Sequence, residues 1–489
     1  MDQQTTVQYK TYASRWYVLI LYAVLGVSQN MVYSTISPIA PYAEQALNLN
    51  QTDISLLANW YNIMFIIGVF PYMWLIQVKG LRLPITSAAV LMATGAFVRC
   101  LNSGNLVPSF DKAMLHFGQA INGLASSVLW FSCTKISATW FPPSERTIST
   151  SIALVSGGFG VAISFVVGPY TVKGIAGNLL DSGNYTENES YALAIRYLFY
   201  GESIVTAILC LMTVIYFPSQ PPSPPCYTAT SERFNFIEGF KKFSTSLDGW
   251  LIFLLYSISG QVFGKIKKKS FKSHLNLNYF DSFIYSVCSN NLTRYFDKHR
   301  NWVAGIRSYN CNVCLWPGII KLSTFCSIIC YSIILKVTSL TAQRWLQRHP
   351  KLITCFLMAI GAGCTIIFLI ATEFHRPLLS PGLVWSTMII GAFFVSACQP
   401  LWWELACEAM YPVPEQIVAG IFALGSTIIA LIFFLLYSFP KLGTDWVNWC
   451  LAISECICVP LILFYSGEKK RLSDDKKHDK ILEINPTDN

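Results

Sequence analysis

Polar side chains recur on one face of an otherwise apolar stretch near the start of the chain. The series is Tyr22, Gly26, Gln29, Tyr33 and Ser37, with Asn30 beside it. Steps of three and four residues place side chains on one face of an α-helix. Amide, hydroxyl and aromatic groups on such a face suit the binding of a small organic molecule with hydrogen-bonding groups.

Three further apolar stretches carry similar polar and aromatic residues, and together they predict a shared binding cavity. The predicted substrate-binding residues are Gln29, Asn30, Tyr33, Gln119, Asn122, Ser126, Tyr256, Gln261, Gln399 and Trp403. An alternative is that these groups only join packed helices, for about 0.6 kcal/mol each. Four such stripes in corresponding segments of the chain favour the cavity.

Ionisable residues inside the apolar stretches are few, and an acid there is a candidate for carrying protons. Glu202 is the predicted proton-coupling residue, with pairing to Arg196 or Arg99 as the alternative. Other charged residues lie near the ends of apolar stretches, where ion pairs that hold two parts of the molecule together are expected. These predicted latch residues are Glu145, Arg146, Glu404, Glu408 and Glu415.

Catalytic and cofactor signatures are absent from the sequence. It contains no phosphate-binding loop, no HExxH motif and no nucleophile elbow. The six histidines lie outside the apolar stretches or at their edges, which disfavours a metal or haem held between helices. The prediction is a protein that is not an enzyme and holds no metal or cofactor.

The elements that must position these residues are long apolar helices. The chain has 489 residues, of which 53% are hydrophobic and 12% charged. A bilayer core of about 30 Å needs roughly 20 helical residues. Twelve candidate spans lie near 16–40, 55–77, 83–101, 112–136, 148–170, 195–217, 249–264, 317–340, 352–372, 382–404, 417–439 and 447–466. We therefore predict an all-α membrane protein.

An internal repeat divides these spans into two sets of six. The sequence Phe141-Pro142-Pro143-Ser144-Glu145-Arg146 returns 270 residues later as Tyr411-Pro412-Val413-Pro414-Glu415-Gln416. Both copies lie between apolar spans, as expected for matching loops in two halves of a secondary transporter. The prediction is two pseudo-symmetric six-helix bundles that move a small solute by alternating access.

Basic residues collect in short loops and tails, so the net charge of +9 indicates membrane topology rather than nucleic-acid binding. The predicted parts are a cytoplasmic tail at 1–15, bundles at 16–217 and 249–466, a cytoplasmic linker at 218–248 and a cytoplasmic tail at 467–489. Glycosylation sequons at Asn50, Asn184 and Asn188 fall on the opposite side, which agrees with this topology.

One stretch does not fit the repeat. The seventh span is short and ends at the basic run Lys265-Ile266-Lys267-Lys268-Lys269, which opens a polar insert at 265–316. So basic a run on the outer side opposes the charge rule. Three interpretations stay open: a real outer loop, retained non-coding sequence that truncates the seventh helix, or an insert with a binding role.

Several motifs resemble solute carrier family 49, the feline leukaemia virus subgroup C receptor-related transporters of the major facilitator superfamily. They are Arg15-Trp16, Val98-Arg99-Cys100, the Trp140–Arg146 segment and the Trp403–Glu415 segment. The stretches Leu75–Arg82 and Gln29–Pro38 resemble the disrupted-in-renal-carcinoma 2 branch, member 4. This resemblance implies a major facilitator fold and a monomeric lysosomal carrier for a vitamin-like solute, linked to protons.

Within that resemblance pyridoxine is the foremost candidate solute. Choline-carrying relatives have a tryptophan where this chain has Asn30, which weakens an aromatic cage for quaternary amines. The alternatives are a choline, ethanolamine or haem carrier, a non-transporting membrane receptor or scaffold, and residence in the plasma membrane. The partners expected are the solute and the lipid bilayer, without nucleic acid.

Overall fold

The computed structural model describes residues 9–101, 108–231, 233–261, 349–373, 397–437, 445–465 and 470–484, with short pieces between 386 and 395. Every regular element in these ranges is a helix. The predicted insert at 265–316 and the predicted span at 317–340 lie outside the described residues.

The first half of the chain forms six long helical segments. The first is α1 (Ser14–Ser34), which continues through the short 3-10 helix η1 (Ser37–Ile39) into α2 (Ala40–Ala46). The others are α3 (Gln51–Lys79), α4 (Arg82–Cys100), α5 (Pro108–Trp140), α6 (Arg146–Asp181) and α7 (Glu187–Ile215).

The linker and the second half follow. The linker holds two short helices, α8 (Tyr227–Thr230) and α9 (Phe236–Ser244). The described long helices are α10 (Leu247–Gln261), α15 (Pro350–Glu373), α17 (Gln399–Met410), α18 (Glu415–Tyr437) and α19 (Asp445–Phe464). A final helix, α20 (Lys470–Ile484), occupies most of the segment that was predicted to be a tail.

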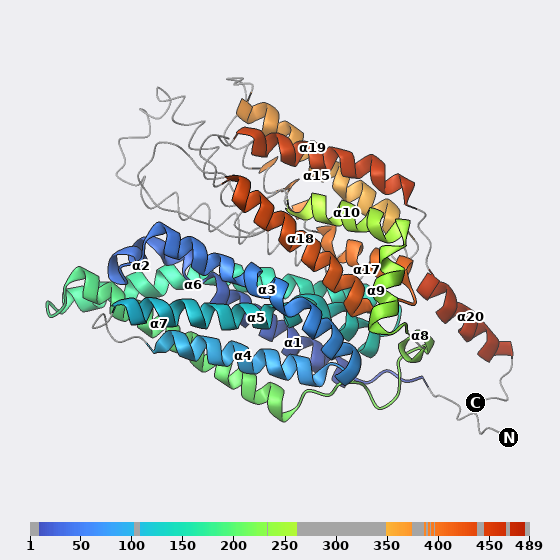
Figure 1. Ribbon diagram of the computed structural model, residues 1–489, viewed down its shortest axis with the longest axis horizontal. Coiled ribbons are helices and arrows are strands. Elements are labelled where there is room, and N and C mark those ends of the chain that lie inside the picture. Colours follow the sequence, from blue (N-terminus) through green and yellow to red (C-terminus); the bar gives the residue numbers. More distant parts are fainter. Residues whose placement is uncertain are drawn as a thin grey trace.

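The two halves lie side by side as separate bundles, and α8, α9 and α20 gather at one end (Figure 1). We call this the terminal end of the molecule. Corresponding helices pack alike: α1 contacts α6 as α10 contacts α18, and α4 contacts α7 as α15 contacts α19. Helix α18 also packs against α3 and α5 across the boundary between the halves. The described part of the chain therefore shows the expected two-fold repeat.

Length and composition of the helices agree with a membrane protein. Seven helical segments within the described residues are long and apolar enough to cross a bilayer. Helix α5 is not among them, although it is 33 residues long, because Gln119, Asn122 and Ser126 make it more polar. A helix of that kind is stable in a bundle only where its polar face meets protein or a cavity.

The first span is interrupted near its middle. Pro38 has no backbone N–H, so the carbonyl of Ser34 loses its usual helical donor, and α1 ends there. Thr35 and Ser34 instead donate their hydroxyl groups to the carbonyls of Met31 and Asn30, each at 2.7 Å. The interruption lies directly beyond the polar face of α1.

Helices α4 and α5 approach each other closely through glycines. A Cβ atom on Gly118 would lie 2.6 Å from the carbonyl oxygen of Gly95, and one on Gly95 would lie 2.7 Å from that of Gly118. Real Cβ atoms do not approach that closely, so an added methyl group would push the two helices apart. Small residues at such crossings are typical of helix packing in membranes.

We expect Gly118→Ala to destabilise the protein by about 1–3 kcal/mol, the usual cost of overpacking. Thermal unfolding of the purified protein in detergent measures this change. The matched control is Gly177→Ala in α6, where an added Cβ meets nothing within 4 Å. Equal melting temperatures for the two variants would contradict the close contact.

Candidate functional site

The polar faces of α1 and α5 meet in the middle of the first half. Gln29 donates from Nε2 to the carbonyl of Asn122 at 3.4 Å, and Asn122 donates from Nδ2 to the carbonyl of Gln29 at the same distance. One helical turn away, Gln119 donates to the carbonyl of Tyr33 at 2.7 Å. The four side chains are buried. The structure therefore brings together the two predicted polar stripes of the first half.

A small pocket lies beside this contact, between α1, α3, α5 and α6. It is lined by Gly26, Gln29, Asn30, Tyr61, Ser126, Leu129, Trp130, Ala153, Leu154, Ser156 and Gly157. The space inside is about 10 Å³, room for about one water molecule, so a solute can enter only after these side chains move apart. Three of the predicted binding residues, Gln29, Asn30 and Ser126, line it directly.

An aromatic cluster connects this pocket to the second half. The Trp130 ring lies 6.5 Å from the ring of Trp403 in α17, edge to face. Trp403 in turn meets Tyr256 of α10 at 6.0 Å, and Tyr256 stacks on Phe422 of α18 at 5.4 Å. Such arrangements are favourable for aromatic rings. Trp403, a predicted residue, thus contacts Trp130 in the wall of the pocket, and the predicted Tyr256 packs behind it.

Two buried amide oxygens in this region have no hydrogen-bond partner among the described residues: Oε1 of Gln119 and Oδ1 of Asn122. Buried acceptors are rarely left unpaired, because the loss of hydration costs about 1–3 kcal/mol. They are therefore available to donors on water or on a ligand.

One predicted binding residue is not part of the pocket lining. Gln399 is half-buried at the first position of α17. Gln261 is the last residue of α10, and its side chain lies outside the described part. The sequence pattern predicts Gln399 and Trp403 on the same helix face, and among the described contacts it is Trp403 that meets Trp130 of the first half.

Glu202 forms a buried ion pair at the interruption of the first span. Its Oε2 lies 3.2 Å from Nη1 of Arg99, and Thr35 donates its hydroxyl to Oε1. The same Nη1 of Arg99 donates to the carbonyl of Val32 at 2.9 Å, and the guanidinium lies over the Phe199 ring. The pair therefore joins α4 and α7 to the carbonyl and hydroxyl groups exposed where α1 ends.

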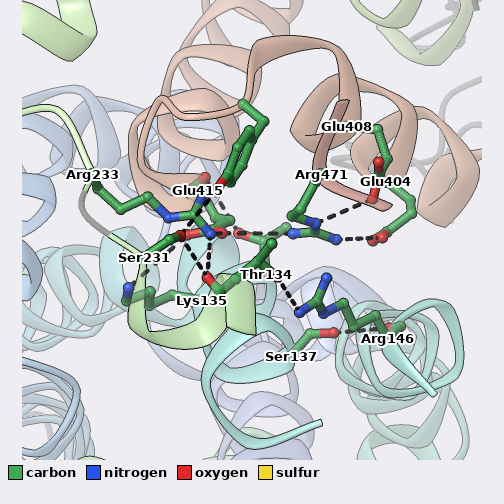
Figure 2. Close-up of polar contacts among 12 residues, drawn as sticks. Thr134, Lys135, Ser137, Arg146, Ser231, Arg233, Glu404, Glu408, Glu415 and Arg471 are labelled. Carbon is green, nitrogen blue, oxygen red and sulfur yellow. Dashed lines mark hydrogen bonds and ion pairs between the residues drawn. The ribbon is translucent and has the colours of Figure 1, made fainter. Parts of the chain in front are cut away.

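A second group of charges, here called the terminal cluster, lies between the halves at the terminal end (Figure 2). Its centre is Glu415, which is 2% exposed and begins α18. Glu415 pairs with Arg233 of the linker at 2.7 Å, with Arg471 of α20 at 3.6 Å and with Lys135 of α5 at 3.9 Å. It therefore connects the first half, the linker and the C-terminal helix.

Arg471 holds α20 on the second half. It pairs with Glu404 at 2.6 Å and with Glu408 at 3.1 Å, both on α17. Burial by itself lowers the pKa of the Arg471 guanidinium, but the adjacent Glu404 and Glu408 raise it, and the net pKa lies well above its ordinary value. Arg471 is therefore a permanent positive charge among three carboxylates.

Asp475, one helical turn further along α20, holds the same helix on the first half. It pairs with Arg146 of α6 at 3.3 Å and accepts from the backbone N–H and hydroxyl of Thr228 at 2.9 and 2.8 Å. Arg146 and Asp475 are both buried. The remaining predicted latch residue, Glu145, pairs with Arg15 at 3.0 Å within the first half.

Sequence reasoning does not reveal Arg471 and Asp475 as site residues, because they lie in a highly charged segment whose composition predicts a solvated tail. Arg233 and Lys135 were missed because basic residues near span ends also serve as topology signals. No pattern in the sequence marks these four residues as partners of Glu415 and Arg146. As for metals, the described residues contain no group of three or more His, Cys, Asp or Glu that could hold an ion.

Comparison with known proteins shows the family to which this chain belongs. The sequence model of the Major Facilitator Superfamily matches residues 19–436. A solute carrier family 49 member 4 homolog of Xenopus laevis is 27% identical over 473 residues, which cover 95% of this chain and 93% of the relative. The choline/ethanolamine transporter FLVCR1 of Felis catus is 24% identical, over 95% of this chain and 74% of the relative.

The fold comparison agrees. The crystal structure of the fucose:proton symporter FucP of E. coli superimposes with a TM-score of 0.61 at 12% sequence identity, covering 93% of this chain and 99% of FucP. The family model and the superposition confirm the predicted all-α major facilitator fold, and the sequence relatives confirm the resemblance to solute carrier family 49.

The buried ion pair yields a prediction. We expect Arg99→Met and Glu202→Gln each to lower the free energy of unfolding by about 3–5 kcal/mol, because each leaves the other member of the pair as a buried charge without a partner. The double variant should lose less than the sum of the two, because neither charge remains. Thermal unfolding of the four proteins in detergent measures this coupling. Strictly additive losses would show that the two side chains do not stabilise each other.

Proposed function

Because this chain belongs to the major facilitator superfamily, we propose that it is a secondary active transporter that moves a small organic solute by alternating access. The observation that carries the proposal is the pocket of Gln29, Asn30 and Ser126, which is joined to the second half through Trp130 and Trp403. In transporters of this kind the solute site lies between the halves near the middle of the membrane.

The chemistry of the pocket favours an uncharged, hydrogen-bonding solute with an aromatic ring. Its polar groups are amides and hydroxyls, and the residues that line it include no acid or base. Tyr61 and Trp130 supply rings for stacking. The side-chain oxygens of Gln119 and Asn122, which have no partner among the described residues, lie on the same face of α5 as the lining residue Ser126. Pyridoxine, a hydroxylated aromatic ring, has this chemistry and is the solute we propose first.

A specific observation favours a second solute class. Trp130, Trp403 and Tyr256 form a continuous aromatic cluster, and such faces attract ammonium groups. The relative FLVCR1 is named as a choline/ethanolamine transporter. Choline and ethanolamine are therefore the alternative solutes.

The terminal end is proposed to face the cytoplasm, in accordance with the distribution of basic residues. On the opposite side Asn184 and Asn188 are exposed and suit glycosylation. Asn50 caps α3 by accepting from the N–H of Asp53 at 2.7 Å, and its side chain is exposed as well. A monomer in the lysosomal membrane, with the plasma membrane as the alternative, completes the proposal.

The terminal cluster is proposed to be the cytoplasmic gate. Glu415 and Asp475 join the two halves through Lys135 and Arg146, so opening toward the cytoplasm must separate both pairs. Because several of these groups are buried, each charge must be hydrated when its pair separates and the gate opens. A solute that binds the open and closed states differently then shifts their balance.

Glu202 remains a candidate for proton coupling, and its contacts suggest how protonation would act. A proton on Glu202 would weaken its contacts with Arg99 and Thr35, which hold the interruption of the first span. Proton-driven uptake that persists in Glu202→Gln would argue against this role.

Transport itself tests the carrier. We expect purified protein in proteoliposomes to take up pyridoxine, and Gln29→Ala to reduce its affinity roughly tenfold, since tenfold is about 1.4 kcal/mol, close to one lost hydrogen bond. The control is Gln45→Ala, an exposed glutamine of α2. Choline or ethanolamine uptake in place of pyridoxine would select the second solute class. No uptake of any of the three would favour a receptor or scaffold.

Accessibility tests the gate. Cys133 is 1% exposed and lies near Tyr22 of the first half and Tyr256 of the second. We expect Asp475→Asn to speed maleimide labelling of Cys133 at least about tenfold, because loss of the pair with Arg146 favours the open state. Mass spectrometry of the labelled peptide gives the rate. Lys477→Ala, on the same helix but paired only with Asp474 nearby, is the control. An unchanged rate in Asp475→Asn would contradict the gate.

A further inference from the structure

The second half contains a buried acid that the polar stripes and the terminal cluster do not include. Glu455 is residue 11 of the 20 residues of α19 and has no exposed surface. Its Oε2 accepts a hydrogen bond from the Thr365 hydroxyl of α15 at 2.7 Å. Its Oε1 has no hydrogen-bond partner within the described part of the chain.

Among the described residues, the titratable groups near Glu455 are mainly thiols. They lie on three sides: Cys364 on α15, Cys398 just before α17, and Cys456 and Cys458 on its own helix. On α10, which also packs against α19, the titratable residues are Asp248 in the first turn and Tyr256, whose ring faces Trp403.

The cation of α15 is far away and engaged elsewhere. Lys351 lies 14 residues before Thr365, about 20 Å along the helix. It donates to the carbonyls of Leu463 and Tyr465 at the end of α19. Among the ion pairs of the described residues, none includes Glu455.

In the corresponding helix pair of the first half, the buried acid is paired with a buried cation. Helices α4 and α7 pack together as α15 and α19 do, and they carry Arg99 paired with Glu202. A proton added to Glu202 would leave Arg99 buried without a full partner, which is costly. A proton added to Glu455 strands no opposite charge among the described residues. Of Glu202 and Glu455, it is therefore Glu455 that can gain and lose a proton without disrupting an ion pair of the described part.

We propose that Glu455, hydrogen-bonded to Thr365 between α15 and α19, is a proton-binding site that couples solute movement to a proton gradient. The carboxylate takes a proton from water on the acidic side, crosses the cycle as a neutral acid, and returns the proton to water on the other side. Apolar surroundings favour the neutral acid, and only a state that admits water favours the carboxylate.

The site is placed so that its charge can affect the solute pocket. Helix α19 contacts α10 through Cys458, whose thiol lies 3.7 Å from the carbonyl of Leu255. The next residue on α10 is Tyr256, which belongs to the aromatic cluster. Water drawn toward a charged Glu455 would loosen the packing that holds α10 and Tyr256 in place. The coupling part of this inference rests on the proposed carrier function.

Proton binding is tested on the purified protein without any solute. We expect infrared difference spectra between acidic and alkaline buffer to contain a protonated-carboxyl band that is missing in Glu455→Gln. Glutamine keeps the shape and the acceptor for Thr365, so loss of the band reports the acid and not the fold. The control is Glu238→Gln, an exposed acid of α9, which should keep the band. A spectrum of Glu455→Gln identical to that of the unmodified protein would overturn the proton site.

Coupling is tested in proteoliposomes. We expect Glu455→Gln to lose at least tenfold of the solute accumulation driven by a proton gradient, while exchange of labelled for unlabelled solute stays within twofold. We expect Thr365→Val, which removes the hydrogen bond but keeps the acid, to retain solute accumulation. Full accumulation in Glu455→Gln would overturn the coupling role. Absence of exchange in the unmodified protein would count against the carrier itself, and the infrared result would still decide the proton site.

Discussion

A charge that leaves water must be compensated, and this constraint shapes the described structure from end to end. The terminal cluster places Arg471 among Glu404, Glu408 and Glu415, and Arg146 against Asp475. In the bundle of the first half, Arg99 and Glu202 compensate each other. Because the two members of each pair come from different helices, each ion pair forms only when its two helices are correctly placed relative to each other.

The same constraint separates parts that hold the structure from parts that can change. An ion pair such as Arg99–Glu202 stabilises one arrangement, and it holds the interruption of the first span next to the pocket. Pairs that cross between the halves, such as Lys135–Glu415 and Arg146–Asp475, hold the halves together at the terminal end, and for that reason we propose them as a gate. Glu455, which forms no ion pair within the described ranges, favours whichever protonation state its surroundings permit. Position relative to the boundary between the halves therefore distinguishes the roles of similar side chains.

Much of the fold could be predicted from the sequence because it depends on local properties. Spans follow from runs of apolar residues, and those described lie within a few residues of the predicted limits, apart from extensions such as that of α6 to Asp181. Helical periodicity places Gln29 and Asn122 on two polar stripes, and the structure brings these stripes together. By contrast, helical periodicity predicts both Gln399 and Trp403 as binding residues. Of these two, it is Trp403 that contacts Trp130. Periodicity identifies a face of a helix but not the depth at which another helix meets it.

By itself, the sequence determined the helical class, the two-half repeat and the polar stripes, because hydropathy and period are properties of consecutive residues. Only the tertiary structure decided which charges are partners. Arg471 and Asp475 lie more than 300 residues from Arg146 along the chain, in a segment whose composition resembles a solvated tail. Folding buries them and brings them to within hydrogen-bonding distance of their partners. Electrostatic interaction depends on distance in space and on removal from water, and neither quantity is encoded in the order of the residues alone.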